Sequence, residues 1–185
     1  MIDDFTNPPA DCATANDRPS GAIVWRSYAP GHDAQPLAAL FRSAILTLAA
    51  SHYDATQRAA WASGADDLEA FDARLRRGVT LVAQCGAEYA AFGQLFPCDH
   101  VEMLYVAPAW ARRGLASALI ARLEAIARDA QAMTLDTDAS ALARPVFERA
   151  GFSLVAQETV RRGSVSLPRF HLCKPLNEVS LAVSF

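Results

Sequence analysis

The fold is decided by residues 100–127, which read HVEMLYVAP over 100–108, AWARRGLA over 109–116 and SALIARLEAIA over 117–127. Leu104, Tyr105 and Val106 favour a β-strand, and Pro108 ends it. Apolar residues then recur at positions 115, 119, 120, 123 and 126, which is helical spacing. The sequence therefore predicts a strand, a basic turn and a helix.

The turn itself carries two arginines and a glycine, Arg112, Arg113 and Gly114. A helix N-terminus offers unpaired backbone N–H groups and a partial positive charge, and both favour a phosphate. Gly114 lets the backbone approach a ligand, and the arginines add charged, fork-shaped donors. The nucleotide P-loop is excluded because no Lys-Ser/Thr pair follows the glycine, and the dinucleotide fingerprint would need three spaced glycines.

This segment resembles motif A of the GNAT acetyltransferase superfamily. The matching positions are Val106, Pro108, Trp110, Gly114 and Ala116, whereas Ala111 stands where Gln or Arg is usual. The resemblance implies that the pyrophosphate of acetyl-CoA is held on the backbone of residues 112–117. An ordinary strand–turn–helix with a basic turn is the alternative.

A second segment, ASALARPVFERAGF over 139–152, resembles motif B of the same superfamily. Its matching positions are Ser140, Ala143, Phe147, Gly151 and Phe152. Ser140 suits a helix N-cap and Gly151 a C-cap. Two shorter stretches, 51–61 and 162–176, are similar to a bacterial YafP-like subfamily, and the whole resemblance spans roughly residues 22–176.

The remaining chain agrees with a mixed α/β (α+β) sheet with helices on both faces, the twisted central sheet of the GNAT fold. Helices are expected over 34–50, 54–62, 66–77, 114–129 and 140–149. Strands are expected over 22–28, 79–85, 88–96, 101–106, 133–136, 152–160 and 169–174, with a hairpin turning at Gly86.

The resemblance also implies a set of residues that bind acetyl-CoA. They are Leu104, Tyr105, Val106, Arg112, Arg113, Gly114, Leu115, Ala116, Ser117, Ser140, Ala143 and Phe147. Acetyl transfer to an amine further needs a base, donors for the oxyanion and an acid for the thiolate.

Glu102 is the candidate base, because it lies on the strand that leads into the turn, close to the expected thioester. Asp136 is the reserve candidate, and Asp138 is more simply a residue favoured near a helix start. The alternative for Glu102 is a solvated strand residue. Many relatives carry Tyr at the position of Phe147, as the acid for the thiolate of CoA. Phe cannot donate a proton, so either Tyr105 or Tyr53 replaces that acid or none is used.

His52, Tyr53 and Trp61 follow the first long helix, a region that resembles the wall of the acceptor groove in GNAT folds. They are candidate substrate-binding residues, with Trp61 in the core and His52 on the surface as the alternative. The remaining histidines have no metal-ligand spacing, so no metal is expected.

Composition favours a soluble globular protein, since 52% of the 185 residues are hydrophobic and 20% are charged. A net charge of −3 gives no general attraction to nucleic acid or to an anionic membrane. No apolar run reaches membrane-spanning length, and the acidic, polar start is not a signal peptide. The four cysteines show no Cys-x-x-Cys spacing. We therefore expect a cytoplasmic protein with reduced thiols. The resemblance to the YafP-like subfamily implies a bacterial protein, and a monomer or a homodimer is expected.

Residues 22–176 are expected to form a single domain. Residues 1–21 are polar and rich in Pro and Asp, which predicts a flexible extension. In residues 177–185, alternating apolar positions predict an extra strand, which folds back on its own domain or is shared across a dimer.

The function implied by the resemblance is transfer of an acetyl group from acetyl-CoA to a primary amine of a small molecule or peptide, by direct attack in a ternary complex. Phe147 and Ala111 leave a second possibility, a catalytically weak acyl-CoA-binding or regulatory module. A third, a toxin that acetylates aminoacyl-tRNA, would need a basic face, which the net charge argues against.

Overall fold

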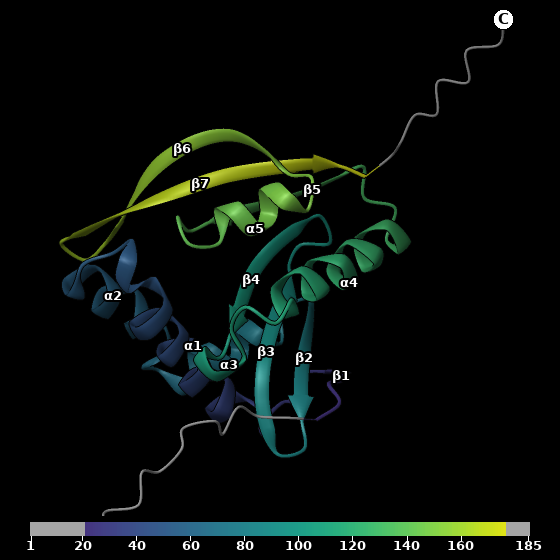
Figure 1. Cartoon of the computed structure of the whole chain (residues 1–185), viewed down its shortest axis with the longest axis horizontal. Coiled ribbons are helices and arrows are strands. Elements are labelled where there is room, and N and C mark those ends of the chain that lie inside the picture. The colour runs from purple at the N-terminus through teal and green to yellow at the C-terminus, as the bar shows by residue number, and fades with distance from the viewer. Residues whose placement is uncertain (1–20, 177–185) are drawn as a thin grey trace, which may run out of the picture.

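The computed structural model describes residues 21–176 and arranges their strands in one seven-stranded sheet (Figure 1). The strand order is β1-β2-β3-β4-β5-β7-β6, and only β4 and β5 are parallel neighbours. The strands are β1 (Val24–Ser27), β2 (Val79–Cys85), β3 (Glu88–Leu95), β4 (His100–Val106), β5 (Thr134–Ala139), β6 (Ser153–Arg162) and β7 (Val165–Pro175). This confirms the mixed sheet expected from the sequence.

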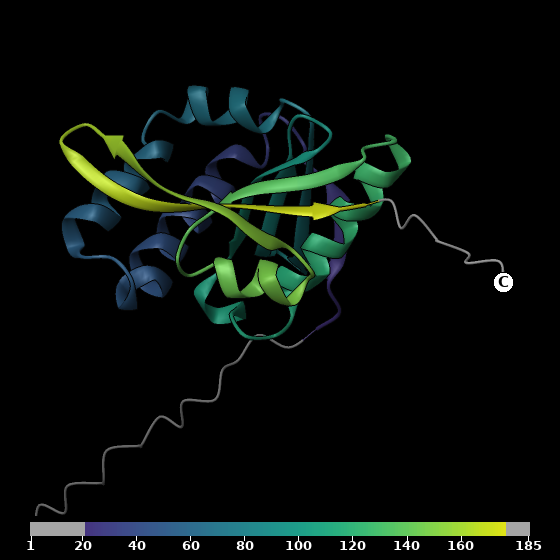
Figure 2. The ribbon, with the colours of Figure 1, turned by 90° about the horizontal axis from the view of Figure 1, so that it is seen from above.

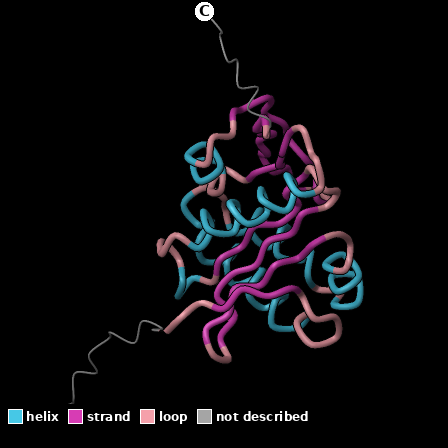
Figure 3. Tube along the Cα trace, turned by 90° about the vertical axis from the view of Figure 1, so that its right-hand side faces the viewer, coloured by secondary structure: helices cyan, strands magenta, loops and turns pink. Residues whose placement is uncertain are grey.

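Helices cover both faces of this sheet (Figures 2 and 3). They are α1 (Ala34–Leu48), α2 (Ala55–Ala62), α3 (Leu68–Leu75), α4 (Leu115–Asp129) and α5 (Arg144–Arg149), with short 3₁₀ turns η1 (Ala49–Ser51), η2 (Ser63–Ala65) and η3 (Pro108–Trp110). Helices α1 and α3 pack on one face around Phe92 and Met103. Helices α4 and α5 pack on the other face around Val101 and Leu135. The apolar residues predicted at helical spacing over 115–126 lie on one face of α4, and this face packs against the sheet.

Strand β5 and helix α5 differ in extent from their predictions. Strand β5 continues to Ala139, because its two acidic residues, Asp136 and Asp138, are held by histidines of the neighbouring strands. Helix α5 begins only at Arg144 with Ala143 as N-cap, so Ser140 is not the helix cap. Asp138 accordingly lies in a strand and not at a helix start.

The last two strands are also longer than predicted and pair as a hairpin up to Arg162 and Val165. Pro168 has no N–H and weakens the strand pattern of the sequence. It is tolerated here because this part of β7 pairs only with β6, opposite Thr159. The tail 177–185 and the extension 1–20 lie outside the described residues, and with them the predictions made for both ends.

A buried carboxylate fixes the start of α1 to two strands. The Asp33 side chain is fully buried and accepts hydrogen bonds from Arg26 of β1 at 2.5 and 2.9 Å and from the Tyr89 hydroxyl of β3 at 2.8 Å. The Ala29 N–H donates at 2.7 Å. Burial alone would raise the pKa of Asp33, but these hydrogen bonds, with one from His32, together lower it well below its usual range.

We expect Asp33→Asn to lower the free energy of unfolding at pH 7 by about 2 kcal/mol, because charge-assisted hydrogen bonds are lost. A depressed folded-state pKa gives a stabilisation that is fully present above the unfolded pKa of about 3.9 and is lost progressively as the pH falls from there to the folded-state pKa. In urea unfolding, the difference between variant and wild type should therefore be constant from pH 7 to about pH 5 and should shrink steadily as the pH is lowered below about 4. A difference independent of pH would contradict this, and the exposed Asp129→Asn is the control.

Candidate active site

The parallel strands β4 and β5 pair only at one end. His100 lies opposite Asp136 and Val101 opposite Thr137, and within the described chain no further pairs join these strands. Beyond that point β4 continues to Val106 and β5 to Ala139, so the two strands separate. Backbone N–H and C=O groups on this side of β4 consequently lack a strand partner and can bind a ligand.

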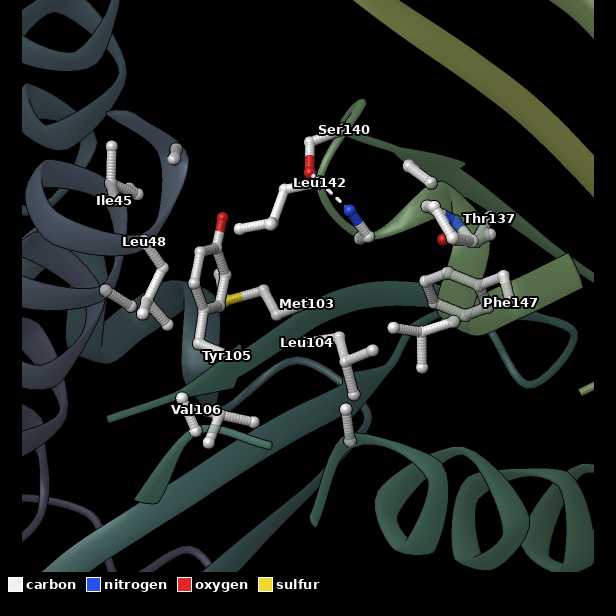
Figure 4. Close-up of a pocket in the computed structure, with 18 of the residues that line it drawn as sticks. Ile45, Leu48, Met103, Leu104, Tyr105, Val106, Thr137, Ser140, Leu142 and Phe147 are labelled. Atoms are coloured by element: carbon white, nitrogen blue, oxygen red, sulfur yellow. Dashed lines mark hydrogen bonds between the residues drawn. The ribbon is translucent and has the colours of Figure 1, made fainter. Parts of the chain in front are cut away.

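A cavity of about 880 Å³ occupies this opening, and we call it the main cleft (Figure 4). Leu104, Tyr105 and Val106 line it from β4, whereas Ser140 and Phe147 line it from the segment after β5. A single cleft thus receives side chains from both predicted motifs.

The turn before α4 closes one end of the main cleft. Gly114 adopts φ +80°, and Arg112 φ +61°, both in the left-handed region. A Cβ built on Gly114 would meet no atom within 4 Å, so the space beside it is open. The N–H groups of Leu115, Ala116 and Ser117 precede the first helical hydrogen bond, from Ala118 to Gly114 O, and therefore face outward from the helix end.

All but one of the residues expected to bind acetyl-CoA line the main cleft. Those lining it are Leu104, Tyr105, Val106, Arg112, Gly114, Leu115, Ala116, Ser117, Ser140, Ala143 and Phe147. The exception is Arg113, whose guanidinium lies over the Trp110 ring at 4.8 Å from its centre. Of the two arginines of the turn, Arg112 is thus the one that can contact a ligand in this cleft.

Phe147 belongs both to the cleft and to the core. Its side chain is 1% exposed and packs edge-on against Phe152, with ring centres 5.1 Å apart. Ser140, at the opposite end of the same segment, accepts a hydrogen bond from the Ala143 N–H at 3.1 Å. The hydroxyl therefore shapes the turn before α5, although it does not cap that helix.

A second cavity of about 260 Å³, the side groove, adjoins the main cleft. The two share Trp61, Glu102, Tyr105, Asp138, Ala139 and Ser140 in their linings. Strands β6 and β7 form the far wall with Val160, Arg162, Leu167, Pro168 and Arg169. Two ligands, one in each cavity, would meet beside Glu102 and Tyr105.

Glu102 lies at an irregularity of β4. Gln94 pairs with Met103 and Leu95 with Val101, so Glu102 is the extra residue of a β-bulge. Its Oε1 accepts hydrogen bonds from Arg74 of α3 at 2.7 and 3.2 Å, and its Oε2 lies 3.7 Å from Nε2 of His100. The candidate base thus faces both cavities in a fixed orientation.

The reserve base has a different environment. Asp136 is hydrogen-bonded to Nδ1 of His100, and it lines neither cavity. Asp138 lies two residues further along β5, on the same face of the sheet, and it lines both cavities. It contacts His171 at 3.2 Å and Arg169 at 3.1 Å. His100 lines the side groove and contacts Asp136, so it connects the Asp136 carboxylate with the groove.

Tyr105 presents its hydroxyl to the junction of the cavities (Figure 4). Burial raises the pKa of Tyr105 to about 12, while a hydrogen bond from Trp61 Nε1 at 3.2 Å works in the opposite direction. The phenol consequently keeps its proton at neutral pH and can donate it. The ring itself stacks on Phe92, with centres 5.4 Å apart.

The three residues expected on the acceptor wall have different environments. Trp61 lines both cavities, and His52 is exposed at the rim of the main cleft. Tyr53 is 4% exposed and lines the side groove, but its hydroxyl donates to Pro168 O at 3.2 Å and accepts from the Ala141 N–H at 2.9 Å. Tyr53, between η1 and α2, is therefore hydrogen-bonded both to β7 and to the turn before α5.

Sequence reasoning gave no role to Arg74, His100 or Arg169, which line the side groove. The sequence did indicate the adjacent arginines Arg161 and Arg162, which follow the predicted strand 152–160, either as a solvated bend of the last hairpin or as a pair that attracts an acidic acceptor or the 3′-phosphate of CoA. Of these two, Arg162 lines the groove. Among residues 21–176, no group of three or more His, Cys, Asp or Glu side chains could hold a metal ion. In the same range, no helix has both the length and the apolar character to cross a membrane.

The family model of the acetyltransferase (GNAT) domain matches residues 49–168 of this chain. The uncharacterized N-acetyltransferase YafP of Escherichia coli (strain K12) is 35% identical over 151 residues, which cover 81% of this chain and 94% of YafP.

Solved structures agree with this match. A GCN5-related N-acetyltransferase from Rhodopseudomonas palustris superposes with a TM-score of 0.80 at 35% identity, covering 84% of this chain and 96% of that one. The PaiA N-acetyltransferase of Thermoplasma acidophilum, solved in complex with coenzyme A, has a TM-score of 0.69 at 15% identity and covers 83% and 99%. The second likeness is one of fold alone.

Proposed function

Because the chain belongs to the GNAT acetyltransferase family, we propose that it moves an acetyl group from acetyl-CoA to a primary amine of a small molecule or peptide. The observation that carries this proposal is the meeting of the main cleft and the side groove beside Glu102 and Tyr105. One cavity would hold the acyl donor and the other the amine, so transfer is direct within a ternary complex.

The main cleft fits the donor. The outward N–H groups of residues 115–117 and the Arg112 guanidinium would receive the pyrophosphate. The unpaired edge of β4 would hydrogen-bond the amide groups of the pantetheine arm, and its N–H groups would stabilise negative charge on the acetyl oxygen. Acetyl-CoA supplies the activated acetyl group as a thioester.

Protons are moved by two residues of β4. Glu102 would accept the proton of the attacking amine, and the protonated Tyr105 phenol would donate to the departing thiolate. Phe147 lies in the same cleft but has no proton to give. These roles make Glu102 and Tyr105 the catalytic residues of the proposal.

A direct test incubates the full chain with acetyl-CoA and a panel of amines and measures free CoA thiol. We expect amine-dependent release, with the acetylated amine identified by mass spectrometry. Binding of acetyl-CoA without amine-dependent release for any amine would contradict the proposal and favour an acyl-CoA-binding module.

Phe147→Tyr tests whether this ring borders the donor. A hydroxyl without a partner in the core should lower the free energy of unfolding of the ligand-free protein by about 1–3 kcal/mol. Bound CoA should recover part of that loss, because its thiol offers the hydroxyl a partner. Calorimetric melting with and without CoA measures both effects. Phe152→Tyr, in the same core but outside both cavity linings, should lose stability equally in the two states.

A further inference from the structure

The side groove carries more positive than negative side chains. Its lining contains Arg74, Arg162 and Arg169 against Glu102 and Asp138. Arg74 is paired with Glu102 at 2.7 Å, and Arg169 is paired with Asp138 at 3.1 Å and with Glu158 at 2.7 Å. The Arg162 guanidinium makes no hydrogen bond or ion pair with any residue in 21–176. One positive charge of the groove is thus left for a ligand.

The backbone that carries Arg162 is held in place. Arg162 pairs with Val165 at the tip of the β6–β7 hairpin, which reaches over α2 (Figures 1 and 2). Gln57 of α2 donates to Ser166 O at 3.0 Å, and Tyr53 donates to Pro168 O at 3.2 Å. These two hydrogen bonds fix the hairpin as the outer wall of the groove.

The Arg162 side chain extends across that wall toward the helices. A Cβ placed on Gly64 of η2 would lie 3.6 Å from its Nη1. The positive charges of Arg162 and Arg74 also both lower the pKa of Tyr105, against the larger effect of burial, which raises it. Arg161 precedes it in the strand, so it points to the opposite face and lines neither cavity.

Beside its charged and polar side chains, the groove lining contains four apolar ones, Trp61, Val160, Leu167 and Pro168. A ligand that extends from Arg162 to the junction with the main cleft would place its apolar part against these side chains. At one end lies the carboxylate of Glu102, which attracts an amine, and at the other lies an unpaired guanidinium, which attracts an anion.

Resting on the proposed function, we infer that the acceptor is an amine that also carries an oxyanion, and that Arg162 binds this oxyanion at the outer end of the side groove. Carboxylate and phosphate both match the planar fork of a guanidinium. The acceptor class is therefore amino acids, peptides with a free carboxylate or aminoalkyl phosphates. A diamine is disfavoured, since its second ammonium would face Arg162.

The test compares charged and neutral partners of the same amine. Each common amino acid is offered beside its carboxamide, and 3-aminopropyl phosphate beside 3-aminopropanol, with kcat/KM measured for each. We expect at least one acid or phosphate to exceed its neutral partner by about tenfold or more, as the loss of a charge-assisted hydrogen bond implies. The α-amine of a carboxamide is the easier to deprotonate, so intrinsic reactivity works against this result. If the preference appears between an amino acid and its carboxamide, Arg162 binds a carboxylate; if it appears between 3-aminopropyl phosphate and 3-aminopropanol, Arg162 binds a phosphate.

Two matched variants locate the effect. Arg162→Gln should remove the preference for the charged partner, and Arg161→Gln should keep it. Binding of the corresponding N-acetylated amino acids and N-acetylated 3-aminopropyl phosphate, and of their neutral partners, to the CoA-loaded protein, followed by NMR, should show the same ranking without turnover.

The outcomes separate the two proposals. A chain that does not bind CoA would count against the proposed function. A CoA-binding chain that treats charged and neutral partners alike, that binds none of them, or that keeps its preference in Arg162→Gln would overturn the assignment of Arg162 alone.

Discussion

Gly114→Val should bind CoA at least about 100-fold more weakly than the wild-type chain. The substitution places a branched side chain in the open space beside the turn, where the pyrophosphate is proposed to approach the N–H groups of residues 115–117. Losing two charge-assisted hydrogen bonds of about 1.5–3 kcal/mol each corresponds to a change of that size or larger. Isothermal titration calorimetry with CoA measures it directly.

Backbone strain must be separated from the loss of the ligand site. Gly114 has φ +80°, a region that β-branched residues avoid at a cost of about 1–3 kcal/mol. Gly86→Val is the matched control, because Gly86 has φ +56° and also has no atom within 4 Å of a Cβ, but it lies in the β2–β3 turn and lines neither cavity. Both variants should lose similar stability, and only Gly114→Val should lose CoA affinity. Unchanged affinity in a folded Gly114→Val protein would place the phosphate site elsewhere.

The basic turn at residues 112–114 was predictable, with its flanking strand and helix, because these parts are neighbours in the sequence. Strand, turn and helix follow one another over residues 100–127, and each has its own local signal: β-favouring side chains, a glycine and an amphipathic period. Helix α2 is a similar case, since Asp54 and Gln57 form a reciprocal capping box at its start. Local chemistry determines these elements, and the family match confirms the resemblance that the two motifs indicated.

The side groove was not predictable in the same way. Arg74, Glu102 and Arg162 come from α3, β4 and β6, and only the folded sheet brings them together. The bulge that turns Glu102 out of the regular pairing depends on the register between β3 and β4, which alternation along one strand does not reveal. Ser140 shows a related limit, because a residue suited to cap a helix instead caps the turn before it.

Glu102→Gln should lower kcat by about 10²-fold or more at neutral pH, the usual contribution of a general base, while the Kd for CoA stays near the wild-type value. Gln keeps the shape of the side chain and can still accept a hydrogen bond from Arg74, but it cannot take a proton. The deficit should shrink as the pH rises toward the pKa of the acceptor amine, because the amine then loses its proton to water without help.

The control for Glu102→Gln must also remove the charge of a carboxylate that pairs with an arginine of the groove. Glu158→Gln does this, because Glu158 pairs with Arg169 at 2.7 Å, the same distance as between Glu102 and Arg74, and lines neither cavity. We expect Glu158→Gln to keep kcat within a few-fold of wild type. If it lost as much activity as Glu102→Gln, the effect would come from the charge balance of the groove. If instead Glu102→Gln kept full activity and Asp136→Asn lost it, the base would be the carboxylate acting through His100.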